Sequence, residues 1–343
     1  MKKTKYFYIL IVMWLLVSCN KESKNAREKI YVANELEGTI SVLNADTYKE
    51  IKKIDLSYKG EMYKAHNVDV TPDGKYAMAT AVPHSINGEE FLMLMNSKND
   101  KVKKRIRLGK DQHLSHVVID ANSSMAYVTA YDPGQLIVVS LIAENVSKRI
   151  DLGKQTGPHG LRILGKKVYI ACLESKELLE VDVLTNQIKR TYLDGVAVQT
   201  AVFDKIPLVC VSLYDKKQIV KYNTQTGDTN VISLPLDSQG PIQIYPSKDN
   251  TLLYVCDQGI LDNRPYSNKV YVIDVNSNQV IKTIEVGKGA HGVTTNDAGS
   301  KLFITNIFDN TVSVIDASSY EVLQTITVGV SPNGIAHLIN PYK

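Results

Sequence analysis

Histidines that stand beside glycines are the residues of this chain whose type and spacing suggest chemistry. Four of the seven histidines, His66, His116, His159 and His291, lie at the head of short apolar segments, as in GPHGLRI and GAHGVTT. Imidazole nitrogens bind borderline metal ions such as Zn²⁺ and Cu²⁺, and they titrate near neutral pH. A site made from them requires a fold that brings four distant segments together.

The histidine segments belong to an internal repeat. We call the first residue of each such segment its head. When the segments are aligned on the histidines, seven heads recur at intervals of roughly 40–50 residues, and Gln199, Ile242 and Asn333 take the place of histidine in three of them. Each head strand is followed by a turn such as TPDGK, a second strand, and alternating third and fourth strands. Four short antiparallel strands in this length of chain are typical of a propeller blade.

The two ends of the chain complete each other. The residues after position 29 supply the second to fourth strands of a unit, and the C-terminal SPNGIAHLINPYK supplies only a head strand. Pairing the two fragments closes the ring and removes its open ends. The sequence therefore predicts an all-β, seven-bladed propeller of four-stranded antiparallel blades over residues 29–343.

The N-terminus predicts a membrane anchor. Three lysines precede an apolar stretch of about a dozen residues, which suits a signal peptide and is too short to span a bilayer. The stretch ends in Leu-Val-Ser-Cys, which resembles the lipobox of bacterial lipoproteins. That resemblance implies a signal peptide over residues 1–18, lipid on Cys19 and a polar tether over residues 19–28. Asn20, in place of aspartate, favours the outer membrane, with the propeller in the periplasm or at the cell surface.

Composition narrows the possible partners. Removing residues 1–18 takes away three lysines and no acidic residue, so the formal charge falls from +4 to +1 and gives no electrostatic case for nucleic acid. Beyond Cys19, the cysteines Cys172, Cys210 and Cys256 fall at positions that alternate between strand faces. We expect them to be small buried side chains without a disulfide framework. A C-x-x-C-H motif is missing, which argues against covalent c-type haem.

Two units carry a specific family resemblance. Tyr31-Val-Ala-Asn followed by TISVLN, and Phe303-Ile-Thr-Asn followed by TVSVID, resemble the YVTN-type repeat of YncE-like propellers. The resemblance is weak in the fourth unit, where Val209-Cys-Val-Ser replaces the motif. It implies the seven-bladed architecture. It also implies that lactonase-type hydrolases and streptogramin lyase, whose repeats contain Pro-His-Gly, share this fold.

The predicted fold places the heads around one mouth of the central channel, because the first strand of each blade lines the channel. We expect this mouth to bind a small ligand, a metal complex or a protein partner. The expected binding residues are His66, His116, His159, Gln199, His291, Asn333, Asp132, Asp257, Arg264, Tyr266 and Asp309. Arg264 and Tyr266 come from an enlarged loop, residues 257–269, which either leans over the mouth or is solvated.

Two interpretations of the histidines stay open. Either they hydrogen-bond neighbouring blades and order the strand heads, or His66, His116, His159 and His291 bind a metal, a haem-type cofactor or an anion.

The favoured function is a monomeric, membrane-anchored binding protein. The first alternative is a metal-dependent hydrolase or lyase, lactonase-like or streptogramin-lyase-like, that uses the histidine ring. No nucleophile elbow is present, so this alternative depends on fold similarity. The second alternative is a surface adhesion or assembly protein.

Overall fold

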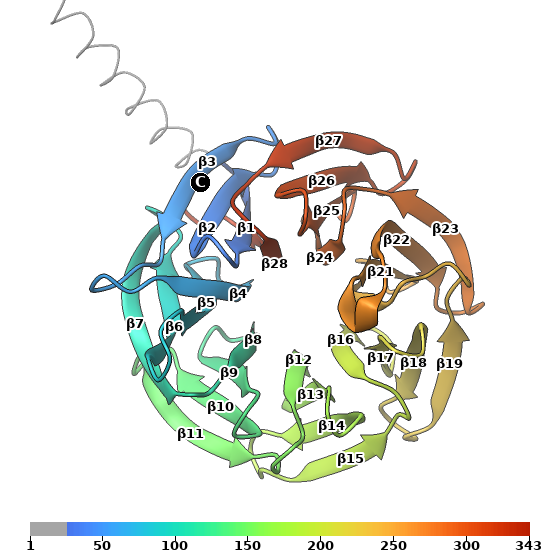
Figure 1. The fold of residues 1–343 in the computed structure, drawn as a ribbon, viewed down its shortest axis with the longest axis horizontal. Helices are drawn as coiled ribbons and strands as arrows, with labels where there is room; N and C mark the ends of the chain where they lie inside the picture. Colours follow the sequence, from blue (N-terminus) through green and yellow to red (C-terminus); the bar gives the residue numbers. More distant parts are fainter. Residues whose placement is uncertain (1–25) are drawn as a thin grey trace, which may run out of the picture.

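The computed structural model describes residues 26–343, which form seven sheets arranged radially around a central channel (Figure 1). The predicted all-β, seven-bladed propeller is confirmed. The signal peptide, Cys19 and most of the predicted tether lie outside the described residues. Within the described part of the chain, no helix is long and apolar enough to cross a membrane.

Each blade is a four-stranded antiparallel sheet, and we number the blades in chain order, with the closing blade as blade 7. From the channel outward, blade 1 contains β4 (Tyr63–Val70), β5 (Tyr76–Pro83), β6 (Glu89–Asn96) and β7 (Lys101–Lys110). Blade 2 contains β8 (Leu114–Ile119), β9 (Met125–Ala130), β10 (Gln135–Ser140) and β11 (Asn145–Asp151). Blade 3 contains β12 (Pro158–Leu164), β13 (Lys167–Cys172), β14 (Glu177–Asp182) and β15 (Ile188–Tyr192).

The remaining blades repeat this order. Blade 4 contains β16 (Ala197–Phe203), β17 (Leu208–Leu213), β18 (Gln218–Asn223) and β19 (Thr229–Ser233). Blade 5 contains β20 (Pro241–Pro246), β21 (Leu252–Gly259), β22 (Tyr266–Asp274) and β23 (Gln279–Glu285), with the 3₁₀ turn η1 (Leu261–Asn263) between β21 and β22. Blade 6 contains β24 (Ala290–Thr295), β25 (Lys301–Asn306), β26 (Thr311–Asp316) and β27 (Val322–Thr327). Blade 7 contains β28 (Pro332–Ile339), β1 (Glu28–Asn34), β2 (Thr39–Asn44) and β3 (Glu50–Asp55).

Blade 7 closes the ring with strands from both ends of the chain. β1 pairs antiparallel with β28, with Glu28 opposite Ile339 and Tyr31 opposite Ala336. Beyond the sheet, the amide of Asn340 donates to the carbonyl oxygen of Arg27 at 2.9 Å. The predicted pairing of the two ends is therefore confirmed, and it leaves no open inner edge in the ring.

A large apolar core lies at each interface between neighbouring blades, and a smaller one adds to the contact between blades 4 and 5. The core between blades 7 and 1, for example, packs Tyr31 and Val42 against Tyr63 and Met93. Strands β1 and β2 are buried along their whole length because both of their faces meet another blade, whereas β3 alternates between exposed and buried residues. The inner strands are therefore covered by neighbouring blades on both faces, whereas the outermost strand of the blade keeps an exposed face.

The asparagine of the YVTN-type motif has a structural role. In blade 7 the side-chain amide of Asn34 donates to the hydroxyl groups of Thr39 and Ser41, both at 3.0 Å. In blade 6 Asn306 makes the same contacts, to Thr311 and Ser313, at 2.9 Å. The motif therefore orders the turn between the second and third strands, and it explains the resemblance without implying a chemical activity.

Candidate functional site

A β-bulge lies at the head of every first strand and sets the positions of the site residues. In each blade two residues of the first strand oppose one residue of the second: His66 and Asn67 in blade 1, and His291 and Gly292 in blade 6. The seven pairs, in blade order, are 66–67, 115–116, 159–160, 198–199, 242–243, 291–292 and 333–334. Bulges commonly re-aim side chains next to functional sites.

The bulges correct the alignment made from the histidines. His66, His159, His291 and Asn333 occupy the first bulge position, whereas His116 occupies the second. Gln199 also occupies the second position, so the sequence alignment was one residue out of register in blades 2 and 4. The error arose because the spacing of apolar residues does not show where a strand inserts its extra residue.

Glycine follows three of the five polar residues at the first bulge position, because the next blade passes too close for a side chain at these three sites. A Cβ atom on Gly292 would lie 2.4 Å from the carbonyl oxygen of Asn333, and one on Gly160 would lie 2.5 Å from that of Val198. A Cβ atom on Gly334 would likewise lie 2.7 Å from the Cα atom of Asn67. The recurring His-Gly and Asn-Gly pairs are therefore a packing requirement of the inner ring.

Hydroxyl groups on the second strands fix the bulges to the next blade. The Thr129 hydroxyl accepts from the amide of His116 at 3.0 Å and donates to the carbonyl oxygen of His159, in the next blade, at 2.7 Å. Thr305 links the amide of Gly292 to the carbonyl oxygen of Asn333 in the same way, at 2.7 and 2.9 Å. Each threonine hydroxyl satisfies backbone amide and carbonyl groups of the bulges that lack a partner in the sheet. It also fixes the head residues of neighbouring blades relative to each other.

Three histidines from successive blades converge. Each of His66, His116 and His159 offers a ring nitrogen, and these three atoms all lie within 4.8 Å of one another. The ring centroids are 5.4 Å apart for His66 and His116, 5.5 Å for His66 and His159, and 4.7 Å for His116 and His159. His116 is fully buried, and the other two are partly exposed. Three of the four histidines expected to form a metal site therefore lie together, and His291 is not part of this group.

Hydrogen bonds orient two of the three rings as metal ligands. The Nδ1–H group of His66 donates to the Oε1 atom of Glu35 at 3.1 Å, and that of His159 donates to the carbonyl oxygen of Val198 at 2.9 Å. With Nδ1 protonated, Nε2 carries the free lone pair in each ring. Metal-binding histidines in proteins are oriented in this way, by a carboxylate or a carbonyl group on the other ring nitrogen.

Two glutamines from the opposite side of the channel contact the third ring. The side-chain amide nitrogen of Gln199 lies 3.4 Å from Nδ1 of His116, and that of Gln243 lies 3.3 Å from Nε2. Gln199 also donates to Oε1 of Gln243 at 2.6 Å. Since a neutral imidazole accepts at one nitrogen only, one of the amides faces the lone pair of His116, and a bound cation would displace it.

Gln243 was missed by sequence reasoning. Ile242 was the one head residue without a polar side chain, but the bulge in blade 5 contains both Ile242 and its neighbour Gln243. The sequence does show a polar residue one position after the aligned head, but this residue can be assigned to the site only when the bulge is known.

His291 and Asn333 extend the site on the side of blades 6 and 7. The Nδ1–H group of His291 donates to Oε1 of Gln258, and its Nε2 atom is buried without a hydrogen-bond partner in the described residues. The same holds for Nε2 of His66 and for Oδ1 of Asn333. Three buried acceptor atoms from neighbouring blades thus lack donors, and a cation or a ligand with donor groups would satisfy them.

Electrostatics keep most of the histidines neutral. Burial lowers the pKa of His159 to about 4 and that of His291 to about 3, and nearby His66 adds to both shifts. The pKa of His116 also falls well below its usual range, through burial and the neighbouring imidazoles. Burial would raise the pKa of Glu35, but His66 and the amide of Asn333 outweigh it and lower the pKa to about 2. The site therefore presents three neutral imidazoles, those of His116, His159 and His291, together with the carboxylate of Glu35.

The aspartates expected at the mouth bind residues of the segments that connect one blade to the next. Asp257 is fully buried, and it accepts from the Ser238 hydroxyl at 2.7 Å and from the amide of Gly240 at 2.7 Å. Asp309 accepts from the amide of Lys288 at 2.8 Å. Asp132 lies on the rim, where its carboxylate pairs with the imidazole of an exposed residue, His113, at 2.5 Å. These aspartates are outside the histidine cluster.

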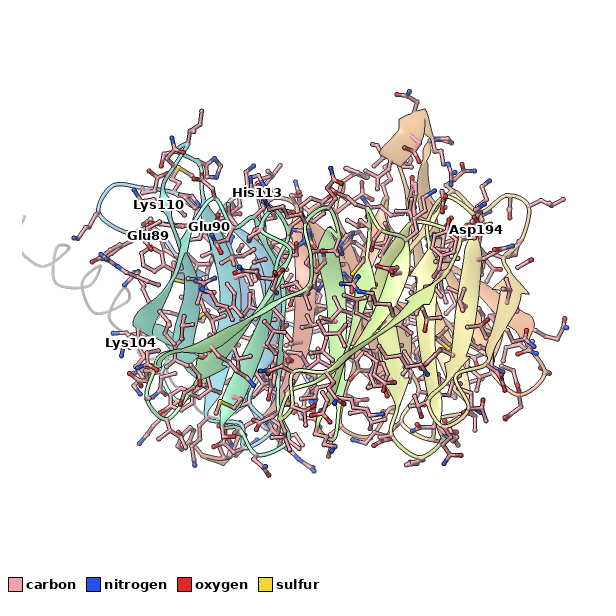
Figure 2. The ribbon with its side chains drawn as sticks, turned by 90° about the horizontal axis from the view of Figure 1, so that it is seen from below. Glu89, Glu90, Lys104, Lys110, His113 and Asp194 are labelled. Carbon is pink, nitrogen blue, oxygen red and sulfur yellow. The ribbon has the colours of Figure 1, made fainter. Side chains whose placement is uncertain are left out.

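The enlarged loop rises above the mouth, but its arginine is used within the protein. Figure 2 shows the loop, in orange, projecting beyond the rim on which His113 lies. The Arg264 guanidinium donates to the carbonyl oxygens of Tyr214 and Gln239 at 3.0 and 3.2 Å, and to that of Asp215 at 3.1 Å. It therefore anchors the loop to blade 4. Tyr266 remains half exposed on the rim, near Phe308, and is accessible to a large ligand.

The cluster suits a single metal ion better than a haem. A tetrahedral zinc ion with bonds of about 2.0–2.1 Å holds its nitrogens roughly 3.4 Å apart, so small ring rotations would close the three histidines around it. The three rings are in edge-on contact, which leaves no opening for a planar macrocycle between them. The three cysteines play no part, because all are buried, free and on different blades, as predicted.

Comparisons with known proteins agree with the fold. The profile of the YncE-like β-propeller family matches residues 84–301. Among curated proteins, none matches the sequence. Hydrazine synthase of Kuenenia stuttgartiensis is 14% identical with a TM-score of 0.69, covering 81% of this chain and 90% of its own.

Two further solved structures share the architecture. A putative 6-phosphogluconolactonase of Bacteroides fragilis is 12% identical with a TM-score of 0.68, covering 92% of this chain and 99% of its own. A catalytically inactive histidine-to-alanine variant of virginiamycin B lyase from Staphylococcus aureus, with quinupristin, is 13% identical with a TM-score of 0.66, covering 81% and 90%. At these identities the likeness shows the fold alone.

Proposed function

Since this chain belongs to the YncE-like β-propeller family, we propose that it is a binding protein that holds a transition-metal ion between His66, His116 and His159. The family fixes the architecture, and the chemistry depends on the residues of the channel mouth. The observation that carries the proposal is the convergence of three imidazoles, two of them oriented by a hydrogen bond on the other ring nitrogen.

The donor set indicates which ions would bind. Neutral imidazole suits Zn²⁺, Cu²⁺, Ni²⁺ and Fe²⁺, and an all-nitrogen set offers little to Mg²⁺ or Ca²⁺. Three protein ligands leave a tetrahedral ion one open position, which an external ligand takes in many metal sites. We propose that donor groups of that external ligand bind Nε2 of His291 and Oδ1 of Asn333, which are buried without a hydrogen-bond partner among the described residues. The site would then recognise a small molecule through the metal and the protein together.

The direction of β1 suggests how the protein is presented. β1 runs from Glu28 to Asn34, and Glu35 at its end contacts His66 at the mouth, so the chain enters the propeller at the opposite face. The proposed lipid-bearing Cys19 precedes Ala26 by a segment that spans at most about 25 Å. We propose that the lipid anchors this opposite face to the outer membrane. The channel mouth would then point away from the bilayer, accessible to a ligand or a protein partner.

A metal-dependent hydrolase or lyase is the second candidate. It is supported by Nε2 of His291, a buried imidazole nitrogen without a hydrogen-bond partner among the described residues, on a ring whose pKa is lowered by nearby His66. Against it stands the pKa of about 3 for this histidine, because a general base works best with a pKa near the operating pH. A His291 imidazole that stays neutral is better suited to bind a metal ion or accept a hydrogen bond than to carry a proton. The adhesion role is the weakest candidate, with Tyr266 and Phe308 as its exposed aromatic residues.

Metal analysis of the full chain, purified in detergent without chelators, tests the proposal. We expect one equivalent of a transition metal, and loss of that metal in the His66→Ala and His116→Ala variants. His113→Ala is the matched control, because His113 lies on the exposed rim outside the cluster. Protein that stays metal-free after incubation with zinc and copper would refute the proposal. Equal loss of metal in all three variants would also refute it.

A further inference from the structure

A separate cavity lies in the channel beyond the histidines, and it has the features of a ligand site. Its volume is about 260 Å³. Its walls come from the innermost strands of all seven blades, because each contributes at least one lining residue. Gln243, which contacts His116, also lines the cavity and marks its boundary with the histidine cluster. The cavity is large enough for a small organic molecule.

The cavity contains one cation whose hydrogen-bonding capacity is largely unused. The guanidinium of Arg162, on β12, makes one hydrogen bond within residues 26–343, from Nη1 to the carbonyl oxygen of Leu161 at 2.9 Å. A guanidinium carries five N–H donors in a planar arrangement that matches a carboxylate. An arginine that faces a cavity with most of its donors unused is typical of an anion-binding site.

A carboxylate faces the same cavity from another blade. Asp69, on β4, accepts from the amide of Val70 at 2.9 Å with Oδ1 and from the amide of Ile119 at 3.1 Å with Oδ2. Each oxygen keeps a second lone pair for another donor. Burial raises the pKa of Asp69 to about 6, although the charge of Arg162 acts in the opposite direction. Within the described residues Asp69 and Arg162 do not form an ion pair, so an occupant can bridge them.

The remaining walls are partly apolar and partly polar. Val68, Val117, Val202, Val293 and Ile335 supply apolar surface, and Asn67, Thr294 and His337 are among the polar residues that line the cavity. A ligand that matches this arrangement has a carboxylate for Arg162, a hydrogen-bond donor beside it for Asp69, and a short apolar side chain for the valines. Such a molecule is a small α-amino or α-hydroxy acid.

We propose that this cavity is a second binding site, separate from the proposed metal site, for a small α-amino or α-hydroxy carboxylic acid held between Arg162 and Asp69. The site does not depend on the metal, since neither residue belongs to the histidine cluster. The apolar side chain of the acid lies against the valines of the channel wall. No bond is made or broken.

Isothermal titration of the detergent-purified full chain tests this proposal with four related probes. L-valine and 2-hydroxyisovalerate carry both recognition groups, isovalerate lacks the donor, and L-valinamide lacks the carboxylate. We expect L-valine or 2-hydroxyisovalerate to bind at least tenfold more tightly than isovalerate and valinamide, since each missing group leaves a buried partner unsatisfied. Whichever of the two binds more tightly identifies the donor as amine or hydroxyl.

Variants separate the cavity from the metal site. Arg162→Met should weaken binding of the better acid roughly ten- to a hundredfold, whereas Arg107→Met, on the exposed outer strand β7, should leave binding unchanged. Val202→Phe, which fills the cavity without changing its charge, should abolish binding even if Arg162→Met does not fold. Each titration is run with and without chelator, and we expect the same affinity in both.

Several results would overturn the proposal. One is equal binding of valine and valinamide, and another is full affinity in folded Arg162→Met or Val202→Phe protein. A third is the absence of binding by all four probes. Binding that disappears with the metal would place the acid at the histidine cluster and also contradict this inference. If metal analysis fails while acid binding persists, the proposed function is wrong and the cavity site stands.

Discussion

Replacing Gly292 with alanine should destabilise the propeller through the contact between blades 6 and 7. The added methyl group would lie 2.4 Å from the carbonyl oxygen of Asn333 and 2.9 Å from the hydroxyl oxygen of Thr305. Gly292 has no positive φ, so the substitution adds volume without backbone strain. Overpacking of this kind costs about 1–3 kcal/mol, and a lost Thr305 hydrogen bond costs about 1 kcal/mol more. We therefore predict a loss of about 2–4 kcal/mol in the free energy of unfolding.

Urea unfolding followed by far-ultraviolet circular dichroism measures this loss as a lower midpoint with an unchanged slope. Gly165→Asn is the control, because a side chain there meets open space and asparagine tolerates the φ of +60°. If the contact with Thr305 causes the effect, the Gly292→Ala/Thr305→Ala double variant should lose less stability than the sum of the single variants. A change below about 0.5 kcal/mol in Gly292→Ala would refute the packing explanation for the His-Gly pairs.

Four further predictions follow from the same contacts. Glu35→Gln should weaken metal binding about 10- to 100-fold in a competition titration, since the carboxylate orients His66; unchanged affinity would remove Glu35 from the site. Metal-free protein should lose stability as the pH falls from 6.5 towards 4, because unfolding frees His159 and His291 to bind protons that the folded state excludes. Urea midpoints should show this loss, and His159→Gln should reduce it. Arg264→Ala should make residues 257–269 sensitive to limited proteolysis, because the loop loses its bonds to blade 4; a cleavage rate equal to that of the parent would contradict this role. Cys172, Cys210 and Cys256 should resist thiol reagents until the protein unfolds, because burial raises their pKa values; mass spectrometry of labelled peptides detects any modification of the native state.

The propeller could be predicted because the sequence patterns that form its strands and turns are local and recur in every blade. The spacing of the heads, the turns and the alternating outer strands all report strand-length patterns, which depend on neighbours in the sequence. The two incomplete end units predicted the pairing of β1 with β28 for the same reason. The alternation of side chains along a strand predicted that the three cysteines do not share a site, and their small apolar side chains predicted their burial.

The candidate site was predicted only in part, because its details depend on contacts between distant blades. His66, His116 and His159 were expected to converge, but the bulge that shifts His116 by one position leaves no mark in the hydrophobic pattern. Asp257 and Arg264 were expected to face the ligand. They instead satisfy backbone groups of neighbouring connections, a role that residue type does not distinguish from binding. Arg162 and Asp69 line the same cavity but are far apart in the sequence, so no local pattern predicts that they share a site.

X-ray absorption spectroscopy of the zinc-loaded full chain tests the central claim most directly, since it reports the atoms bound to the ion. We predict three imidazole nitrogens at about 2.0–2.1 Å and one further light atom, the same spectrum in His113→Ala, and loss of the bound zinc in His116→Ala. A spectrum dominated by sulfur or carboxylate oxygen, or one that His116→Ala leaves unchanged, would contradict a metal site between His66, His116 and His159.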